Sequence, residues 1–257
     1  MIAHNITDAP SSLPQPMKVA VLVSGNGSNL QVLIDAVNAG KLPIEIVGVM
    51  SNKEDAYALS RAKEAGIETC VLSHVQNGQP FEFNESSSFK YDTIKKMGIK
   101  TFERHALIQL NEWQPHLIVL AGFMRVLSSE FIANAPAPMI NLHPSLLPKF
   151  KGLDTHQRAI EAGEAYHGCS VHVVTAELDA GQVLTQAVMP LAPSESQNDP
   201  SNPDSQTPES LQQAVHRLEH QLLPWTILLI AKEVLNLNNL TDSNSHLIHL
   251  PIRLWFD

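Results

Sequence analysis

The sequence predicts an α/β fold with a mostly parallel, doubly wound sheet that becomes antiparallel toward the C-terminus. Two observations lead to this prediction. Short β-branched runs alternate with segments of helical period between residues 18 and 163, which is typical of strands joined by crossover helices. Residues 168–190 instead alternate and turn around Asp179-Ala180-Gly181, which is typical of antiparallel strands. We therefore expect a parallel first half and a mixed second half.

The first predicted strand is the run KVAVLVS at 18–24, whose unbroken β-branched character suits a strand covered on both faces. The segment SNLQVLIDAVNAG at 28–40 then has apolar residues at helical spacing and ends at Gly40. The same patterns predict the elements that follow, in this order: strand 45–52, helix 56–66, strand 68–73, helix 93–113, strand 116–122, helix 128–135, strand 139–144 and helix 155–163.

The last part of the chain is less regular. Helical spacing returns from about Glu209 to Asn236, where Pro224 is expected to kink or break a long helix. The tail that follows has enough apolar side chains to pack as a last strand or arm. The predicted organisation is a flexible leader at 1–16, a single domain at 17–240 with polar loops near 76–92 and 193–208, and a C-terminal tail at 241–257.

Composition narrows the class of protein. The 257 residues carry a formal net charge of -9, and the 17 lysines and arginines are dispersed, so no nucleic-acid partner is expected. Cys70 and Cys169 lack the paired spacing of a zinc or redox site, which suits a reducing compartment. Apolar runs such as 117–124 are far shorter than the roughly 20 residues that span a bilayer, and the first residues lack the features of a secretory signal. We expect a cytoplasmic protein without a membrane partner.

The glycine-containing segment SGNGSN at 24–29 leaves the first predicted strand and opens the first predicted helix. Glycines there allow a ligand close to the backbone, and a helix N-terminus favours an anion such as phosphate. A tight turn with Ser28 as the helix N-cap explains the pattern equally well. Dinucleotide binding is less favoured, because Leu30 stands where the third glycine is needed and the second strand does not end in an acidic residue.

Asn141 and His143 end a predicted strand two residues apart, so both side chains point to the same face at the edge where open α/β sheets bind ligands. Asp179 is placed to hold the His143 imidazole charged and oriented. A buried structural histidine and an ordinary turn aspartate are the alternatives. The sequence contains neither a nucleophile elbow nor a metal-binding motif such as H-E-x-x-H, so no metal is expected.

Several segments resemble the folate-dependent formyltransferase family, and the similarity covers residues 18–230. The run N-x-H-P-S-L-L-P followed by H-G-x-S-x-H and D-x-G is highly specific for this family. The loop G-N-G-S-N resembles that of members that act on glycinamide ribonucleotide. The segments are SGNGSNL at 24–30, VLAGFMRVL at 119–127, NLHPSLLPKFKG at 141–152, HGCSVHVVTAELDAGQ at 167–182 and LEHQLLPW at 218–225.

The resemblance implies a Rossmann-like formyltransferase fold and an enzyme. The implied reaction moves a formyl group from the cosubstrate 10-formyltetrahydrofolate to the amine of glycinamide ribonucleotide in purine biosynthesis, without a metal. Both partners are small molecules, and the sequence leaves a monomer and a homodimer open. The implied site residues are Asn141, His143 and Asp179 for catalysis, Gly27, Ser28, Asn29 and Glu219 for the ribonucleotide, and Met124, Arg125, Val126, Leu127 and Asn141 for the folate.

The expected mechanism uses Asn141 and a cationic His143 to stabilise the oxyanion that forms at the formyl carbon. The nearest alternative is a formyltetrahydrofolate hydrolase that directs the same residues at water. Such an enzyme would ordinarily carry a further N-terminal domain, for which the sequence before the first strand has no room. A transferase acting on tRNA and a non-catalytic binding module are weaker alternatives, since the charge is not basic and Asn141, His143 and Asp179 are all present. The family's folate-side arginine has no assigned counterpart here.

Overall fold

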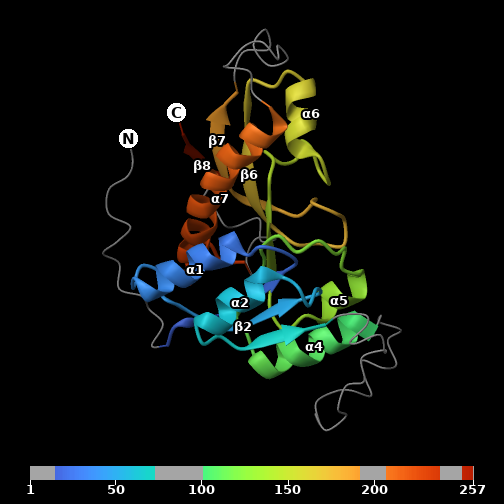
Figure 1. Ribbon diagram of the computed structural model, residues 1–257, viewed down its shortest axis with the longest axis vertical. Helices are drawn as coiled ribbons and strands as arrows, with labels where there is room; N and C mark the ends of the chain where they lie inside the picture. The colour runs from blue at the N-terminus through green and yellow to red at the C-terminus, as the bar shows by residue number, and fades with distance from the viewer. Residues whose placement is uncertain (1–14, 73–100, 192–206, 238–250, 257) are drawn as a thin grey trace.

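The computed structural model describes residues 15–72, 101–191, 207–237 and 251–256. These residues form one eight-stranded sheet with helices on both faces, in the strand order β3-β2-β1-β4-β5-β6-β7-β8 (Figure 1). Neighbours among the first five strands in this order pair in parallel. Strand β6 pairs antiparallel with both β5 and β7. The predicted mixed α/β sheet is confirmed. Most of the predicted leader, the loop at 76–92 and most of the loop at 193–208 lie outside the described residues.

The parallel half is arranged around β1, which lies between β2 and β4. Val19 and Val21 of β1 enter one hydrophobic core, whereas Ala20 and Leu22 enter the core on the opposite face. Because both faces are covered, the strand shows no alternation of apolar and polar residues. The five strands of this half are β1 (Met17–Val23), β2 (Ile44–Ser51), β3 (Thr69–Val71), β4 (Leu117–Leu120) and β5 (Met139–His143).

The second half of the sheet is formed by β6 (Tyr166–Val173), β7 (Val183–Pro190) and β8 (Ile252–Trp255). Strands β6 and β7 form the predicted antiparallel pair around Asp179. Strand β8 belongs to the C-terminal tail, which the sequence predicts to pack as a last strand or an arm, and it forms a strand. It pairs in parallel with β7 and ends the sheet at that edge.

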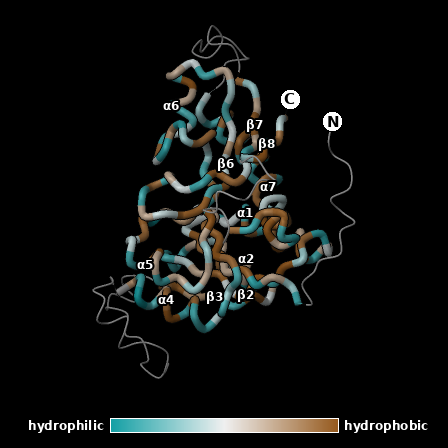
Figure 2. Tube along the Cα trace, turned by 180° about the vertical axis from the view of Figure 1, so that it is seen from behind, coloured by the Kyte–Doolittle hydropathy of each residue, from teal (hydrophilic) through white to brown (hydrophobic). Residues whose placement is uncertain are grey.

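The helices divide between the two faces. Buried residues of α1 (Ser28–Asn38), α2 (Tyr57–Glu64), α6 (Thr155–Glu161) and α7 (Pro208–Ala231) share one core. Buried residues of α4 (Thr101–Trp113) and α5 (Ser129–Asn134) share the other. Figure 2 shows the hydrophobic segments running through the middle of the molecule, where the strands lie between the helices. No helix in the described ranges is long and apolar enough to cross a membrane.

Helix α7 differs from the prediction at Pro224. The helix runs from Pro208 to Ala231 without interruption, so Pro224 does not break it. Leu222, Leu223 and Ile227 around the proline are fully buried in the core, which compensates for the hydrogen bond that proline cannot make. The remaining described elements agree with the predicted ones to within a few residues, and the part of the predicted helix 93–113 that precedes Thr101 lies outside the described residues.

The strand order places a topological switch between β1 and β4, where the connections leave in opposite directions. Ligands of open α/β sheets bind beyond the carboxyl ends of the strands at such a point. The loop after β1 and the loop after β4 meet there, because the backbone N–H of Met124 donates a 2.8 Å hydrogen bond to the Ser24 hydroxyl. The fold therefore brings together two of the segments on which the family resemblance depends.

Candidate active site

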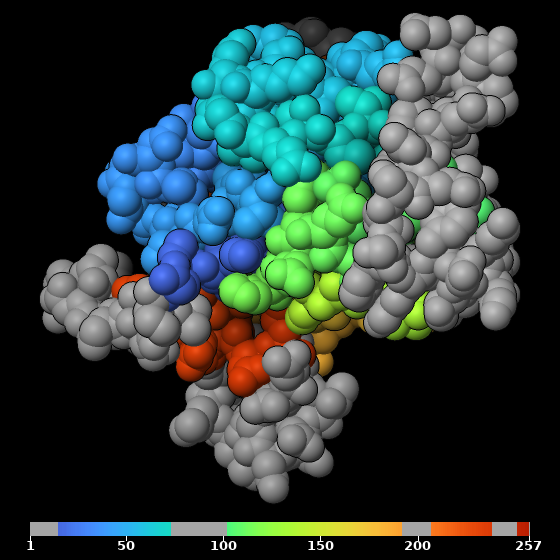
Figure 3. Space-filling view, turned by 90° about the horizontal axis from the view of Figure 1, so that it is seen from below, coloured from blue at the N-terminus to red at the C-terminus, as the bar shows by residue number. Residues whose placement is uncertain are grey.

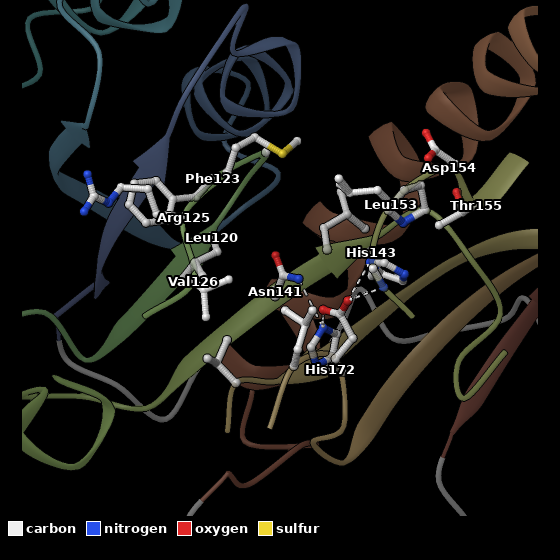
Figure 4. A pocket seen from close by; sticks show the side chains of 18 of the residues that line it. Leu120, Phe123, Arg125, Val126, Asn141, His143, Leu153, Asp154, Thr155 and His172 are labelled. Atoms are coloured by element: carbon white, nitrogen blue, oxygen red, sulfur yellow. Dashed lines mark hydrogen bonds and ion pairs between the residues drawn. The ribbon is translucent and has the colours of Figure 1, made fainter. Parts of the chain in front are cut away.

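A cavity of about 680 Å³ lies beyond the carboxyl ends of β4 and β5. Figure 4 shows Asn141, His143 and His172 close together on one side of it, with Arg125 and Val126 on the other. The cavity is lined by residues from the segments 120–127, 141–144, 152–157 and 172–179 and by Pro208, Glu209 and Gln212 of α7. The predicted catalytic residues and the predicted folate-side segment therefore face one space.

Asn141 and His143 are both on β5 and are two residues apart, so their side chains share a face as predicted. The antiparallel register places Asn141 opposite His172 of β6. The Asn141 Nδ2 atom lies 3.1 Å from His172 Nε2, and His172 Nδ1 lies 2.9 Å from the carbonyl oxygen of Val173. With Nδ1–H donating to the carbonyl, Nε2 accepts from Asn141, whose second N–H is left for an acceptor in the cavity.

Asp179 contacts both histidines. Its Oδ2 atom lies 3.5 Å from His143 Nδ1 and accepts a 2.9 Å hydrogen bond from the backbone N–H of Gly152. Its Oδ1 atom lies 3.5 Å from His172 Nε2. His143, His172 and Asp179 are each at most 9% exposed. A turn aspartate would need none of these contacts, so the geometry favours the functional interpretation of Asp179.

The loop between β6 and β7 is shaped to present this carboxylate. Asp179 has a φ of 48°, in the left-handed region that aspartate tolerates better than most residues. At Gly181, a β-carbon would lie 1.9 Å from the carbonyl oxygen of Val173. Glycine is therefore required where the loop closes against β6, and this close approach keeps Asp179 beside Nε2 of His172.

The electrostatics of the pair differ from the prediction. Burial lowers the pKa of His143 below its usual 6.5, although the Phe150 carbonyl at 3.0 Å and the Asp179 carboxylate both favour the charged ring. Burial raises the pKa of Asp179, but its interactions with His172 and His143 and the hydrogen bond from the Gly152 N–H outweigh this effect and bring the pKa to about 2. Burial therefore favours a neutral His143 ring before the reaction, whereas the sequence led us to expect a cationic one. At pH 7 a neutral imidazole lies beside an ionised carboxylate.

Hydrogen bonds to Ser170 of β6 fix the segment that follows His143. The Ser170 hydroxyl donates a 2.6 Å hydrogen bond to the carbonyl of Ser145 and accepts a 3.0 Å hydrogen bond from the N–H of Leu147. Both bonds are buried, where such contacts order the backbone most strongly. They fix the chain that places the Phe150 carbonyl at the Nε2 atom of His143.

The predicted folate-side residues form an apolar wall of the cavity. Met124 and Val126 are 71% and 72% exposed, and exposed apolar side chains that lie together at a cavity are typical of a ligand-binding surface. The Arg125 guanidinium lies 4.2 Å from the centre of the Phe102 ring, and Leu127 is buried. A ligand with a large apolar surface fits this wall.

The predicted ribonucleotide residues Gly27, Ser28, Asn29 and Glu219 lie in a second cluster, where α1 meets α7, and none of these four lines the cavity. The Ser28 Oγ atom lies 2.7 Å from Nε2 of His216. The Asn29 Nδ2 atom donates a 3.1 Å hydrogen bond to Glu219 Oε2. The structure therefore brings Asn29 and Glu219 together and places this cluster apart from the cavity that Asn141, His143 and Asp179 line.

The alternative role of Ser28 as a helix N-cap is wrong. The N-cap of α1 is Gly27, in the left-handed conformation with a φ of 75°, and no side chain caps this helix end. The first N–H groups of α1 have no intrahelical partner, as at every helix N-terminus. Burial raises the pKa of Glu219 to about 6, against the hydrogen bond from Asn29. A carboxylate that is costly to ionise therefore faces this helix end.

Two further histidines belong to the site and were not assigned from the sequence. His172 contacts Asn141 and Asp179, and His156 lines the cavity with its Nδ1 atom 3.1 Å from Nε2 of His167. Burial, reinforced by His156, lowers the pKa of His167 to about 3. The signal for His172 was its place on an alternating strand, but only the register of β5 and β6 reveals its partner.

Metal and thiol chemistry have little support in the site. Within the described ranges, no group of three or more histidine, cysteine, aspartate or glutamate side chains is arranged to hold a metal ion. Burial raises the pKa of Cys70 to about 12, and Cys169 is fully buried. A thiolate nucleophile is therefore not available at either cysteine at neutral pH.

Comparison with known proteins identifies the family. Residues 17–227 match the formyl transferase family model. Phosphoribosylglycinamide formyltransferase of Escherichia coli (strain K12) is 41% identical over 183 residues, which is 71% of this chain and 77% of that protein. The solved enzyme of the same name from Coxiella burnetii is 41% identical with a TM-score of 0.67, covering 85% of this chain and 89% of that one. The one from Anaplasma phagocytophilum is 30% identical with a TM-score of 0.71, covering 95% and 100%. The chain thus belongs to the formyl transferase family, as the resemblance of its sequence motifs predicted.

Proposed function

We propose that this chain is a cytoplasmic phosphoribosylglycinamide formyltransferase. In this reaction the amine of glycinamide ribonucleotide attacks the formyl carbon of 10-formyltetrahydrofolate. The observation that carries the proposal is that Asn141 and the His143–Asp179 pair line one cavity, in a chain whose family transfers formyl groups. The E. coli relative, at 41% identity, supports the same substrate pair.

Asn141 supplies a hydrogen-bond donor for the oxygen of the formyl group. One N–H of its amide donates to His172 Nε2 at 3.1 Å, so the amide is already oriented before substrate arrives. The second N–H stabilises the negative charge that develops on the formyl oxygen. A donor of this kind that needs no reorganisation typically contributes about 3–4 kcal/mol in the transition state.

His143 and Asp179 handle the proton. As the new C–N bond forms, the attacking nitrogen becomes acidic and gives a proton to the neutral His143. The resulting imidazolium is stabilised by two acceptors already in place, the Phe150 carbonyl at 3.0 Å and the Asp179 carboxylate at 3.5 Å. The positive charge on His143 therefore forms at the same time as the negative charge on the formyl oxygen. When the C–N bond to the folate breaks, the proton passes to the departing folate nitrogen, so the net charge of the site is restored.

The two substrates occupy adjoining regions in this proposal. The apolar wall formed by Met124, Val126 and Leu127 takes the folate ring. The ribonucleotide phosphate binds at the N-terminus of α1, where Ser28 and Asn29 stand. The 2.8 Å hydrogen bond from Met124 N–H to Ser24 joins the two regions, so the amine and the formyl carbon can meet between them.

The test is an assay of the folate product in the presence and absence of glycinamide ribonucleotide. We expect tetrahydrofolate to form only when the ribonucleotide is present, in equal amount to formylated ribonucleotide. An equal rate without the ribonucleotide would show that water is the acceptor and that the chain is a hydrolase. No folate product under either condition would contradict catalysis altogether.

A further inference from the structure

Arg61 reaches from α2 to the loop at 24–29. Its Nε atom donates a 2.9 Å hydrogen bond to the carbonyl of Asn26, and its Nη2 atom donates a 3.1 Å hydrogen bond to the Asn26 side chain. Its Nη1 atom donates to Oε1 of Gln31 in α1 at 3.1 Å. The guanidinium also lies 4.8 Å from the centre of the Tyr57 ring. Helix α1 packs against both α2 and α7, and in Figure 3 the blue segment that contains α1 lies between the cyan segment that contains α2 and the orange segment that contains α7.

Two successive carbonyl groups of the loop are turned toward α2 by these contacts. The carbonyl of Gly25 accepts a 3.1 Å hydrogen bond from the N–H of Ala58, and the next carbonyl, of Asn26, is bound by Arg61. In a trans peptide the C=O and N–H groups point in opposite directions. The N–H groups of Asn26 and Gly27 therefore point away from α2. Within the described part of the chain, neither donates to a protein acceptor.

Successive N–H groups turned to the same side form an anion-binding concavity, and here they continue into the first turn of α1. The loop itself has little to keep this geometry. Gly25 and Asn26 are exposed, and the glycines at 25 and 27 allow many other conformations. The guanidinium offers donors in a rigid plane and satisfies the main-chain and side-chain oxygens of one residue at once. A lysine ammonium, with a single nitrogen, cannot match this pair of bonds and the bond to Gln31.

We infer that Arg61 is a positioning residue for the amine substrate: it turns the Asn26–Gly27 peptide so that the loop N–H groups face the ribonucleotide phosphate. This inference rests on the proposed function, which supplies the phosphate. It concerns the shape of the loop rather than a direct contact between Arg61 and substrate. Arg61 is half-buried under its own hydrogen bonds and does not line the catalytic cavity.

The test compares Arg61→Ala, Arg61→Lys and Lys63→Ala in the full chain. Lys63→Ala removes the same charge from the exposed face of the same helix, two residues away. We expect Arg61→Ala to raise the KM for glycinamide ribonucleotide about tenfold, the effect of losing roughly one hydrogen bond to a charged group, with kcat and the folate KM nearly unchanged. Competitive inhibition by ribose 5-phosphate should weaken by the same factor. Arg61→Lys should recover less than half of the loss, and Lys63→Ala should behave as the wild type.

A wild-type KM for the ribonucleotide in Arg61→Ala would overturn the inference, and so would an equal rise in both KM values. Full recovery in Arg61→Lys, or the same defect in Lys63→Ala, would show that charge alone is responsible and would overturn it as well. Failure of the wild type to form formylated ribonucleotide would instead contradict the proposed function. Ribose 5-phosphate binding, measured by calorimetry on wild type and Arg61→Lys, reports on the loop even if Arg61→Ala does not fold.

Discussion

The Oδ2 atom of Asp179 lies 3.5 Å from Nδ1 of His143, and both side chains are buried. The two residues come from the end of β5 and from the loop between β6 and β7, and the same carboxylate also reaches His172. Since a single carboxylate orients two rings and accepts a hydrogen bond from Gly152, its removal affects the whole group at once. The pair is therefore expected to act as one unit in catalysis.

Asp179→Asn should reduce kcat by about 100-fold or more, because an amide cannot stabilise the imidazolium that forms in the transition state. Both KM values should change little, which is typical of an interaction made mainly in the transition state. Steady-state kinetics with each substrate varied in turn measures this. Glu177→Gln is the matched control, since Glu177 is an exposed carboxylate in the same loop. A rise in KM with unchanged kcat would give Asp179 a binding role instead.

His143→Ala combined with Asp179→Asn tests the coupling directly. Because each residue loses its purpose when the other is absent, the double variant should be little slower than the slower single variant. The measurement is a double-mutant cycle on kcat. If the two losses multiplied, His143 and Asp179 would act independently and the proton-handling pair would have to be abandoned.

The protonation of His143 can be followed by NMR. Burial holds its pKa below 6.5 while Asp179 opposes this effect, so removing the carboxylate should lower the pKa further. We expect the His143 ring to titrate below pH 6.5 in the wild type and at lower pH in Asp179→Asn. Because the unfolded chain binds this proton more readily, the contribution of His143 to stability is present above pH 6.5 and is lost as the pH falls through the folded pKa. A midpoint above 6.5 would restore the preformed imidazolium that the sequence suggested.

Glu219→Gln should stabilise the protein at neutral pH. Burial raises the pKa of Glu219 from 4.5 to about 6, so its contribution to stability is present below pH 4.5 and is lost as the pH rises through 6. The ionised carboxylate then costs about 2 kcal/mol at pH 7.5, and glutamine removes this cost while still accepting from Asn29. Thermal denaturation should show a Tm several degrees higher at pH 7.5 and no gain at pH 4.

The same variant should bind glycinamide ribonucleotide more weakly if Glu219 faces the amine substrate, as the resemblance implies. Higher stability together with a raised ribonucleotide KM would show that the wild-type carboxylate favours substrate binding at the expense of protein stability. A lower Tm at pH 7.5 would contradict the stability prediction. An unchanged KM would remove Glu219 from the binding residues.

Gly27→Ala tests the packing of the phosphate loop. Gly27 has a φ of 75°, and a β-carbon there would lie 2.4 Å from Cβ of Ala58. We expect a loss of about 1–3 kcal/mol in unfolding free energy, as for other overpacked sites, together with a raised ribonucleotide KM. Gly25→Ala is the matched control, because a β-carbon at Gly25 meets no atom within 4 Å. Equal unfolding free energies of the two variants, measured by urea denaturation, would show that the contact between the new β-carbon and Ala58 does not destabilise the protein.

Local sequence determines much of this protein. The unbroken β-branched run of β1 required a strand buried on both faces, and Val19 and Ala20 indeed enter opposite cores. Alternation along β5 placed Asn141 and His143 on one face without any tertiary information. These features follow from periods of two and 3.6 residues, which depend only on backbone geometry. The identity of the two substrates was inferred from the resemblance of the sequence motifs to a known family.

Tertiary structure decided which distant residues meet. The partner of Asn141 depends on the register of β5 against β6, and a shift of one residue would have turned His172 to the other face. The protonation of His143 depends on its desolvation, which no pattern of neighbours along the chain can report. The contact of Arg61 with Asn26 arises because α2 packs beside the loop that opens α1. The sequence therefore determined the helices, the strands and the types of side chain at the site. The packing determined which of these side chains meet and which of them carry a charge.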